Sequence, residues 1–360
     1  MSARSACLAL TVLALLAANA LAAGAAKPGK KSQPTRTAAK NVRPNSTAPS
    51  AATKAVPSKE VPPQAAGPKP TERTAEEAPQ AGVKSYKLRY KFKSGETVRW
   101  EVEHRAKVRT TISASTQSDD SLSNTQTAET LSKSVKVWKV KSVDEQGNVT
   151  LVHSVEHVSM WQKFDGRQET RYDSDTDATP PVGYDNVAAA VGKPLAELTL
   201  DPRGAVVKRE ELFAQAAPLP ENITLPLPEN AVAVGDEWTM PADITVNVPP
   251  QNVTKRIKAR QLYRLESVDD GIATIRLETQ VLTPVNDPII ELQLAQSKAN
   301  GTVRFDTAAG RVVSQESDVD EHVTGFQGPA SNSHYVMRFS EKLLPDEKRA
   351  AYGPLPAARK

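Results

Sequence analysis

Two stretches about a hundred residues apart follow nearly the same pattern. Residues 198–211 read LTLDPRGAVVKREE, and residues 303–317 read VRFDTAAGRVVSQES. Each contains alternating apolar residues, an aspartate, a short turn that ends at a glycine, a Val-Val pair and a polar run. Alternating apolar residues indicate a strand, and Asp and Gly are typical of tight turns. Both stretches therefore predict the same strand-turn-strand unit.

Further matches favour an internal duplication. Residues 262–271 (LYRLESVDDG) resemble residues 138–147 (WKVKSVDEQG), and residues 234–238 (VGDEW) resemble residues 94–98 (SGETV). The matches occur in the same order in both halves. The sequence thus predicts an all-β protein with one short helix, built as two similar antiparallel β lobes that are half-barrel or sandwich-like and cover each other's apolar faces.

Composition divides the chain into six parts. We expect a signal peptide at 1–22, a disordered spacer rich in Pro, Ala and Lys at 23–82, a first β lobe at 83–217, a Pro-rich connector at 218–233, a second β lobe at 234–345 and a C-terminal tail at 346–360.

The first 22 residues have the layout of a secretory signal peptide. A basic residue, Arg4, precedes the apolar run 6–16, and small residues end the segment, with cleavage expected near Ala20 or Ala22. The run is shorter than the ~20 residues that a membrane-spanning helix needs, although an uncleaved anchor is the alternative. The one cysteine, Cys7, lies at the front of this run, where lipid attachment is not expected. A cysteine-free exported protein favours the bacterial periplasm, or secretion.

The basic character of the chain comes from the spacer. Residues 23–82 carry ten Lys and Arg against four Glu, and they lack Leu, Ile, Met and every aromatic residue. Such a segment buries too little apolar surface to fold. From residue 83 onward there are 35 basic and 38 acidic residues, which argues against a nucleic-acid partner. The spacer is either a solvated tether or a weak contact to an anionic surface.

The folded part shows several local signals. Tyr86 to Lys93 alternates apolar and basic residues, which predicts a strand with one solvated face. Residues 110–134 are polar and predict the far end of a long hairpin, and a phase change near Val137 and Trp138 predicts a bulge. Asp185 is expected to cap the one short helix, 186–191.

Two apolar faces in opposite lobes are expected to pack on each other. One face consists of Tyr86, Leu88, Tyr90 and Phe92, and the other of Ala273, Ile275, Leu277 and Val281. Direct packing gives a filled core, as in a scaffold protein. A cavity between the faces, as in a lipid carrier, is the alternative.

Two turn motifs carry a resemblance to a known group of proteins. Gly-Asp-x-Trp at 235–238 and Phe-Asp…Gly-Arg at 305–311 resemble a family of exported, mostly β bacterial proteins of unknown function, over roughly 85–344. The resemblance implies a β fold and no activity. A looser likeness at fold level links the chain to the half-barrel periplasmic lipoprotein carriers.

Residues 153–157 (HSVEH) have the H-x-x-E-H spacing of a zinc peptidase. In those enzymes the motif lies on a helix, whereas residues 149–161 alternate as a strand does. On a strand, His153 and His157 share a face but lie about 13 Å apart, too far for one zinc ion. We therefore expect no metal site here.

Residues 173–177 (DSDTD) resemble the start of an EF-hand calcium loop. The loop needs Gly at its sixth position and Glu at its twelfth, but Ala178 and Tyr184 stand there. A solvated acidic turn is expected, with a weak surface cation site as the alternative.

No further catalytic signature is present in the sequence. It contains no Gly-x-Ser-x-Gly elbow, P-loop or dinucleotide fingerprint. Trp100, Trp138, Trp161 and Trp238 either belong to the core or line a ligand groove. We predict no catalytic, cofactor or metal residues, and a non-catalytic binding or scaffold protein of the cell envelope with an unknown partner. The alternatives are a periplasmic carrier of a lipid or other apolar ligand, and an unrecognised enzyme.

Overall fold

The chain folds almost entirely into β-strands. The computed structural model describes residues 84–113, 123–214, 223–248 and 253–345, so the predictions for 1–82 and 346–360 lie outside the described residues. The strands of the N-terminal half are β1 (Ser85–Tyr86), β2 (Thr97–Ser113), β3 (Ser123–Val143), β4 (Val149–Phe164), β5 (Thr170–Asp173), β6 (Pro194–Leu200) and β7 (Val206–Glu211). Those of the C-terminal half are β8 (Val232–Ala233), β9 (Glu237–Pro241), β10 (Ile244–Val248), β11 (Val253–Ile257), β12 (Ala259–Asp269), β13 (Ile272–Val281), β14 (Asn300–Asp306), β15 (Arg311–Thr324) and β16 (Asn332–Leu343).

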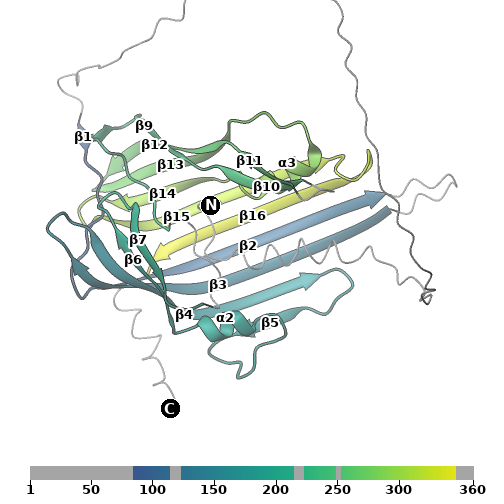
Figure 1. Ribbon diagram of the computed structural model, residues 1–360, viewed down its shortest axis with the longest axis horizontal. Coiled ribbons are helices and arrows are strands. Elements are labelled where there is room, and N and C mark those ends of the chain that lie inside the picture. Colours follow the sequence, from purple (N-terminus) through teal and green to yellow (C-terminus); the bar gives the residue numbers. More distant parts are fainter. Residues whose placement is uncertain (1–83, 114–122, 215–222, 249–252, 346–360) are drawn as a thin grey trace, which may run out of the picture. The chain divides into compact units, whose positions relative to one another are not determined.

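Twelve of these strands form one antiparallel sheet. Its order is β7-β6-β4-β3-β2-β16-β15-β14-β13-β12-β9, and β5 pairs with β4 (Figure 1). The pairs β1–β8 and β10–β11 form two small sheets. The predicted all-β class is thus confirmed. The strands of the two predicted lobes lie in one sheet because β16, from the second lobe, pairs with β2 of the first.

The two halves contribute strands in the same order. From one edge of the sheet to the other, the strands of the second half come first in the order β9-β12-β13-β14-β15. β16 follows, and then the strands of the first half in the order β2-β3-β4-β6-β7, so both halves advance across the sheet in the same direction. A duplicated unit would produce this order. The duplication itself stays a prediction.

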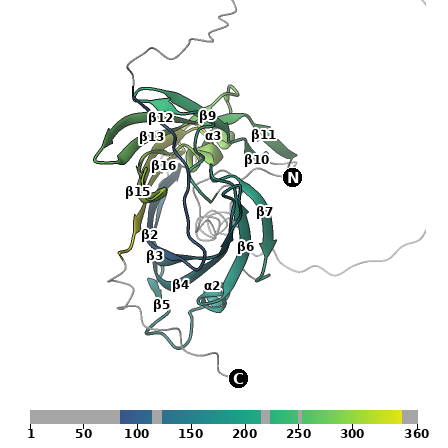
Figure 2. The same cartoon turned by 90° about the vertical axis from the view of Figure 1, so that its left-hand side faces the viewer.

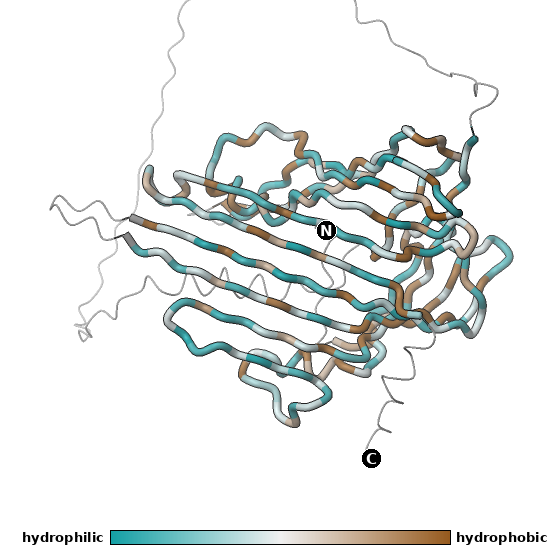
Figure 3. The backbone as a smooth tube through the Cα atoms, turned by 180° about the vertical axis from the view of Figure 1, so that it is seen from behind, coloured by the Kyte–Doolittle hydropathy of each residue, from teal (hydrophilic) through white to brown (hydrophobic). Residues whose placement is uncertain are grey.

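The sheet curves (Figure 2), and its two faces differ in burial and polarity. On β2, Val98, Trp100 and Val102 are buried, whereas the residues between them, Arg99 and Glu101, are more exposed. We call the face that carries Trp100 the inner face and the face that carries Glu101 the outer face. Apolar and polar residues alternate along the long central strands in Figure 3, as expected when one face is solvated.

The segment Tyr86–Lys93 is only partly a strand, in contrast to the prediction. β1 is two residues long and pairs with β8, and residues 87–93 have no strand partner. Their alternation has another cause: Leu88 and Tyr90 enter the core while the basic residues between them stay more exposed. A periodicity of two records which side chains are buried, and it does not require a ladder of hydrogen bonds.

The described residues contain two short helices, so the prediction of a single helix was wrong. The expected one is α2 (Asp185–Ala190), with Asp185 in its first turn and Tyr184, not Asp185, at the N-cap. The second is α3 (Pro288–Ala295), where the Asp287 carboxylate accepts a hydrogen bond from the Ile289 amide at 2.9 Å. Neither helix is long and apolar enough to cross a membrane.

The core joins the two predicted apolar faces. Leu88 and Tyr90 belong to the same buried cluster as Ala273, Ile275 and Leu277, so these parts of the two faces share one core, whereas Val281 packs against a different cluster. The Tyr90 ring meets the Phe305 ring edge-on at 5.5 Å between centroids. Burial of each leucine-sized side chain contributes about 1.5–3 kcal/mol.

The two repeated turns hold this N-terminal segment from both halves of the sheet. The Tyr90 amide donates to the carbonyl of Pro202 at 2.8 Å, and the Lys91 amide donates to the carbonyl of Gly310 at 2.9 Å. A methyl group at Gly204 would meet Tyr90 at 2.7 Å, and one at Gly310 would meet Lys91 at 2.6 Å. In both turns the glycine therefore lets the backbone approach residues 90–91 closely.

Candidate functional site

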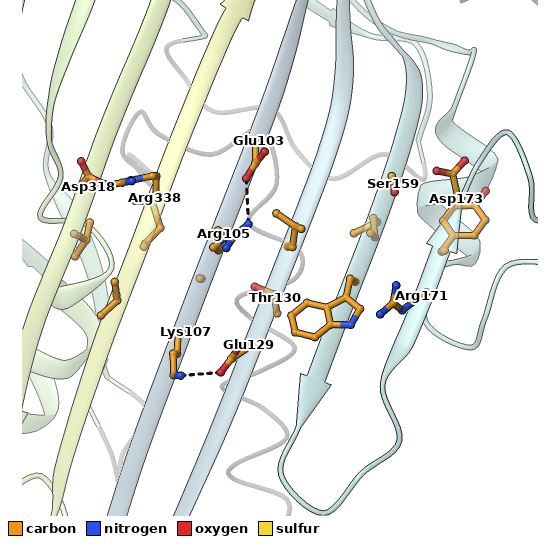
Figure 4. Close-up of a pocket in the computed structure, with 18 of the residues that line it drawn as sticks. Glu103, Arg105, Lys107, Glu129, Thr130, Ser159, Arg171, Asp173, Asp318 and Arg338 are labelled. Atoms are coloured by element: carbon orange, nitrogen blue, oxygen red, sulfur yellow. Dashed lines mark hydrogen bonds and ion pairs between the residues drawn. The ribbon is translucent and has the colours of Figure 1, made fainter.

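A hollow of about 1300 Å³ lies on the outer face of the sheet (Figure 4). Its lining residues come from β15, β16, β2, β3, β4 and β5, which follow one another in the sheet, and from the turn after β5. Neighbouring strands are about 4.8 Å apart, so these six strands span about 24 Å. We call this hollow the outer groove.

Charged side chains of both signs line the outer groove. Six are acidic and four are basic, so a ligand would meet carboxylates and cations along the whole length. The charged residues are Glu103, Arg105, Lys107, Glu129, Arg171, Asp173, Asp177, Asp318, Asp320 and Arg338. Leu131, Trp161, Val336, Ser159 and Thr176 are among the other lining residues.

Strand register places four of these side chains in one row. Arg105 lies opposite Leu131, Leu131 opposite Trp161, and Trp161 opposite Arg171. On the other side, Arg105 lies opposite Arg338. Directly opposed residues project to the same face with Cβ atoms about 4.5–5.5 Å apart. The row therefore runs across the strands along the outer groove.

Most cations of the outer groove pair with a neighbouring carboxylate. The Nζ of Lys107 lies 2.8 Å from a Glu129 oxygen, and the Nε of Arg338 lies 2.7 Å from Asp318 (Figure 4 shows the first of these). The side chains of these pairs are 39–76% exposed. Exposed ion pairs contribute about 0.2–1 kcal/mol each, so these groups can exchange a protein partner for a ligand at little cost.

Trp161 and Arg171 share one carboxylate. The indole Nε1 of Trp161 donates to Glu169 at 3.2 Å, and the Nε of Arg171 donates to the other oxygen of the same carboxylate at 3.0 Å. The hydrogen bonds from Trp161 and Arg171 lower the pKa of Glu169. Glu169 thus stays ionised and keeps the indole and the guanidinium side by side at one end of the row.

The four tryptophans divide between core and groove. Trp100 and Trp138 are buried and meet at 4.9 Å between ring centroids, and Trp238 stacks on Tyr263 at 5.5 Å. Trp161 alone among them lines the outer groove. The core interpretation thus holds for Trp100 and Trp138, and a ligand-binding role stays a prediction for Trp161.

The two histidines of the H-x-x-E-H stretch lie on opposite faces of the sheet, and the prediction of a shared face was wrong. His153 is opposite Trp138 on β3, and His157 is opposite Val135. Positions 135 and 138 are three apart on a strand that pairs with β2 without a shift, so they point to opposite faces. A bulge at Val135 and Lys136 in the β3–β4 pairing changes the phase.

Glu156 and His153 of the H-x-x-E-H stretch lie in different environments. The Glu156 carboxylate accepts two hydrogen bonds from Arg99, at 2.7 and 2.8 Å. His153 is buried, and burial, aided by the positive charges of Lys136 and Arg209, lowers its pKa to about 3. Glu156 is thus held by a guanidinium, and His153 is held neutral inside the sheet.

His157 instead meets the acidic turn after β5. Its Nδ1 lies 3.1 Å from an Asp175 oxygen and its Nε2 lies 3.8 Å from an Asp173 oxygen. Within the turn, the Asp173 amide donates to Asp177 at 2.7 Å and the Asp175 amide donates to Asp173 at 3.0 Å. The carboxylates thus shape the turn around the imidazole of His157, a contact that the strand alternation did not predict.

A part-buried ion pair lies on the inner face at positions that the sequence pattern did not predict. The ammonium of Lys136 bonds to the Glu341 carboxylate, and both side chains are only 12% exposed. The same nitrogen lies 4.6 Å from the ring centroid of Trp100 and 5.0 Å from that of Trp138. Lys136 lies on the same face as Trp138, which a period-two pattern assigns to apolar residues. A lysine at that position therefore interrupts the pattern and does not indicate an inner-face ion pair.

Comparison with known proteins assigns no family to the chain. No family model matches the sequence, and no curated protein matches it. Among solved structures, one described as lipid–protein interactions in lipovitellin has a TM-score of 0.39 and 12% identity, and the match covers 71% of this chain and 26% of that chain. Another, DynF from the dynemicin biosynthesis pathway of Micromonospora chersina, has a TM-score of 0.18 and 7% identity, and the match covers 78% of this chain and 95% of that chain. The resemblance to exported bacterial β proteins stays a prediction.

Proposed function

We propose that this chain is a non-catalytic, exported binding protein of the bacterial cell envelope, and that its outer groove holds an extended glycan. The observation that carries the proposal is the row Arg105, Leu131, Trp161 and Arg171. This row places two guanidinium groups, an indole and an aliphatic side chain along one line across four strands.

The groove chemistry fits a sugar polymer. The flat, apolar face of an indole packs against the apolar face of a sugar ring. Guanidinium and carboxylate groups donate and accept hydrogen bonds in fixed planes, which suits hydroxyl and amide groups spaced along a chain. A groove of about 24 Å has room for about five sugar units in a row.

An extended peptide fits this surface less well. Peptides that add to a sheet bind along an unpaired strand edge, where the main chain offers free hydrogen-bonding groups. The strands under the outer groove, from β16 to β4, each have a neighbour on both sides. A ligand of the groove therefore relies on side chains, which favours a polymer whose own polar groups project outward.

Pairing among the groove residues supports a non-catalytic role. Lys107 is engaged by Glu129, and Arg338 by Asp318. These charges are exposed and balanced by their neighbours. A hydrolytic site instead draws on titratable groups shifted by burial or by like charges. The envelope location is supported by the layout of residues 1–22 and by the absence of cysteine after Cys7.

Co-sedimentation with purified bacterial peptidoglycan tests the proposal. We expect the full chain to pellet with this insoluble amino-sugar polymer, and Arg171→Ala or Trp161→Ala to reduce the bound fraction at least about tenfold, because each removes a side chain from the row. Arg276→Ala is the matched control, since Arg276 is an exposed arginine of β13 outside the outer groove. Equal binding by Arg171→Ala and Arg276→Ala, or no pelleting, would contradict the proposal.

A carrier of an apolar ligand is the second candidate. It is favoured by an apolar cluster on the inner face of the central strands, which includes Val102, Ala106, Val319 and Met337. The neighbouring inner-face positions of β3 are small: Ala128, Thr130, Ser132 and Ser134. Small and apolar side chains of this kind suit packing against an acyl chain. Native mass spectrometry of the chain purified from envelope extracts distinguishes the two, because a stoichiometric lipid is expected only for the carrier.

A further inference from the structure

Two histidines and an aspartate meet near the rim of the outer groove. His322 on β15 and His334 on β16 are direct register partners, and Asp320 lies two residues before His322 on the same face. One ligand atom from each of the three side chains lies within 4.8 Å of the others. Asp320 also lines the outer groove.

The side chains are already in contact with one another. The rings of His322 and His334 stack with centroids 3.8 Å apart and planes 15° apart. The Nε2 of His334 lies 2.7 Å from an Asp320 oxygen. The Asp320 side chain is 70% exposed and that of His334 is 35% exposed. Three groups with metal-ligand chemistry are therefore gathered and open to an ion from solution.

We propose that Asp320, His322 and His334 form a binding site for a divalent transition-metal ion of the zinc, nickel or copper type. Two imidazoles and one carboxylate are a ligand set that these ions take. Zinc bonds to nitrogen and oxygen are about 2.0–2.2 Å long, so neighbouring ligands in a tetrahedron lie about 3.3 Å apart. Metal binding requires the stacked imidazole rings to rotate so that their nitrogens converge, and it replaces the His334–Asp320 hydrogen bond with two bonds to the ion.

The strands fix the ligands in advance. Both histidines belong to long paired strands, because β15 and β16 pair without a shift from the pair Ser314–Lys342 to the pair Thr324–Asn332. Only side-chain torsions have to be ordered on binding, which lowers the entropic cost of the site. Three protein ligands leave a fourth position open to water or to a carboxylate or amide of a bound ligand.

One neighbouring charge opposes the ion. Arg109 on β2 is the register partner of His334, so its guanidinium projects from the same face. The other nearby cations, Lys107 and Arg338, are paired with carboxylates. Arg109→Ala is therefore expected to tighten metal binding, whereas loss of any ligand weakens it.

A metal titration with Zn²⁺ alone tests the site. The full chain, purified without a histidine tag and treated with a chelator, competes with a chromophoric zinc indicator. We expect one zinc per chain, and a loss of affinity of at least about 100-fold in His322→Ala and His334→Ala, because even outer partners of metal ligands contribute 10–100-fold. Both residues lie on a solvated face, so the variants should keep their melting temperatures without metal.

His157→Ala is the matched control. His157 also lies beside two carboxylates, those of Asp173 and Asp175, so it tests whether any histidine near acidic groups suffices. The proposal requires that His157→Ala keeps the wild-type affinity. Undiminished zinc binding in the double variant His322→Ala/His334→Ala, or a loss in His157→Ala instead, overturns it.

Copper gives a second readout that does not depend on affinity. With one equivalent of Cu²⁺, electron paramagnetic resonance of the wild-type chain should show hyperfine coupling to two imidazole nitrogens. His334→Gln should reduce this to one nitrogen. A spectrum without imidazole coupling in the wild-type chain contradicts the proposal even if every variant folds.

Discussion

The amide of Lys91 donates a 2.9 Å hydrogen bond to the carbonyl of Gly310, at the end of the second repeated turn. The residue before it, Tyr90, makes the same kind of bond, at 2.8 Å, to Pro202 in the first turn. One short segment is therefore bonded to both halves of a sheet whose terminal strands are far apart in the strand order. The glycines of the two turns stabilise the fold by allowing residues 90 and 91 to come this close.

Gly310→Ala should destabilise the protein by about 3 kcal/mol. Gly310 has φ +64°, where an L side chain costs about 1–2 kcal/mol. Its new methyl group would lie 2.6 Å from the Lys91 backbone nitrogen and side chain, which adds about 1–3 kcal/mol for overpacking. Denaturant unfolding measures the loss.

Gly95→Ala separates the two contributions. Gly95 has φ +80°, but a methyl group there meets no atom within 4 Å. We expect it to lose only about 1–2 kcal/mol, the conformational part. Equal losses in the two variants would show that close contact at Lys91 is not what Gly310 provides.

Leu277→Ala tests whether the core is filled. Leu277 is 3% exposed and lies in the cluster that contains Leu88 and Tyr90, so we expect a loss of about 2–5 kcal/mol. Leu282→Ala, at a side chain that is 52% exposed, should change the free energy of unfolding by less than about 0.5 kcal/mol. A small effect at Leu277 would point to a cavity at this place.

Glu341→Gln should lower the free energy of unfolding by about 1–3 kcal/mol, because it leaves the part-buried ammonium of Lys136 without its counter-charge. Lys136→Met/Glu341→Gln removes both charges and should recover most of the loss. Asp318→Asn, which breaks the exposed pair with Arg338, should lose less than about 1 kcal/mol. Similar losses at Glu341 and Asp318 would contradict the burial of the first pair.

His153 should make the protein less stable in mild acid. Its pKa of about 3 in the folded chain lies below the ordinary value near 6.5, so the unfolded chain binds a proton first as the pH falls. Stability from this residue is complete above about pH 6.5 and is lost toward about pH 3, at about 1.4 kcal/mol per pH unit. His153→Leu should remove about 2 kcal/mol of the loss between about pH 7 and about pH 5. An unchanged slope would rule out a neutral, buried His153.

Local patterns predicted much of the fold. Turns depend on the backbone preferences of single residues such as Asp and Gly, and alternation depends on the burial of one face of a strand. Both can be read from neighbouring positions, as for the Asp…Gly turns, the hairpin turn at 144–148 and the strands β2 to β4. The sequence did not predict helix α3, although Asp287 and Pro288 are signals of a helix start. A helix of eight residues makes only about two turns, which is too few to show a helical periodicity.

The candidate sites could not be predicted in the same way. The outer groove extends from β15 to β5. Which of its side chains lie next to one another depends on the pairing of β16 with β2, which are separated by more than two hundred residues. The phase of His153 and His157 depends on one bulge at Val135. Pairing partners and bulges are set by the whole sheet, so the sequence shows the ligand-type residues without showing which of them meet.

Calorimetric titration with soluble peptidoglycan glycan fragments of increasing length tests the central claim most directly. Because the row from Arg105 to Arg171 lies in a groove of about 24 Å, affinity should rise with each added sugar up to about five units and then level off. Arg171→Ala should lower the plateau, whereas Arg276→Ala should not. An affinity that is independent of fragment length, or no heat of binding at any length, would contradict the assignment of the outer groove as a glycan-binding site.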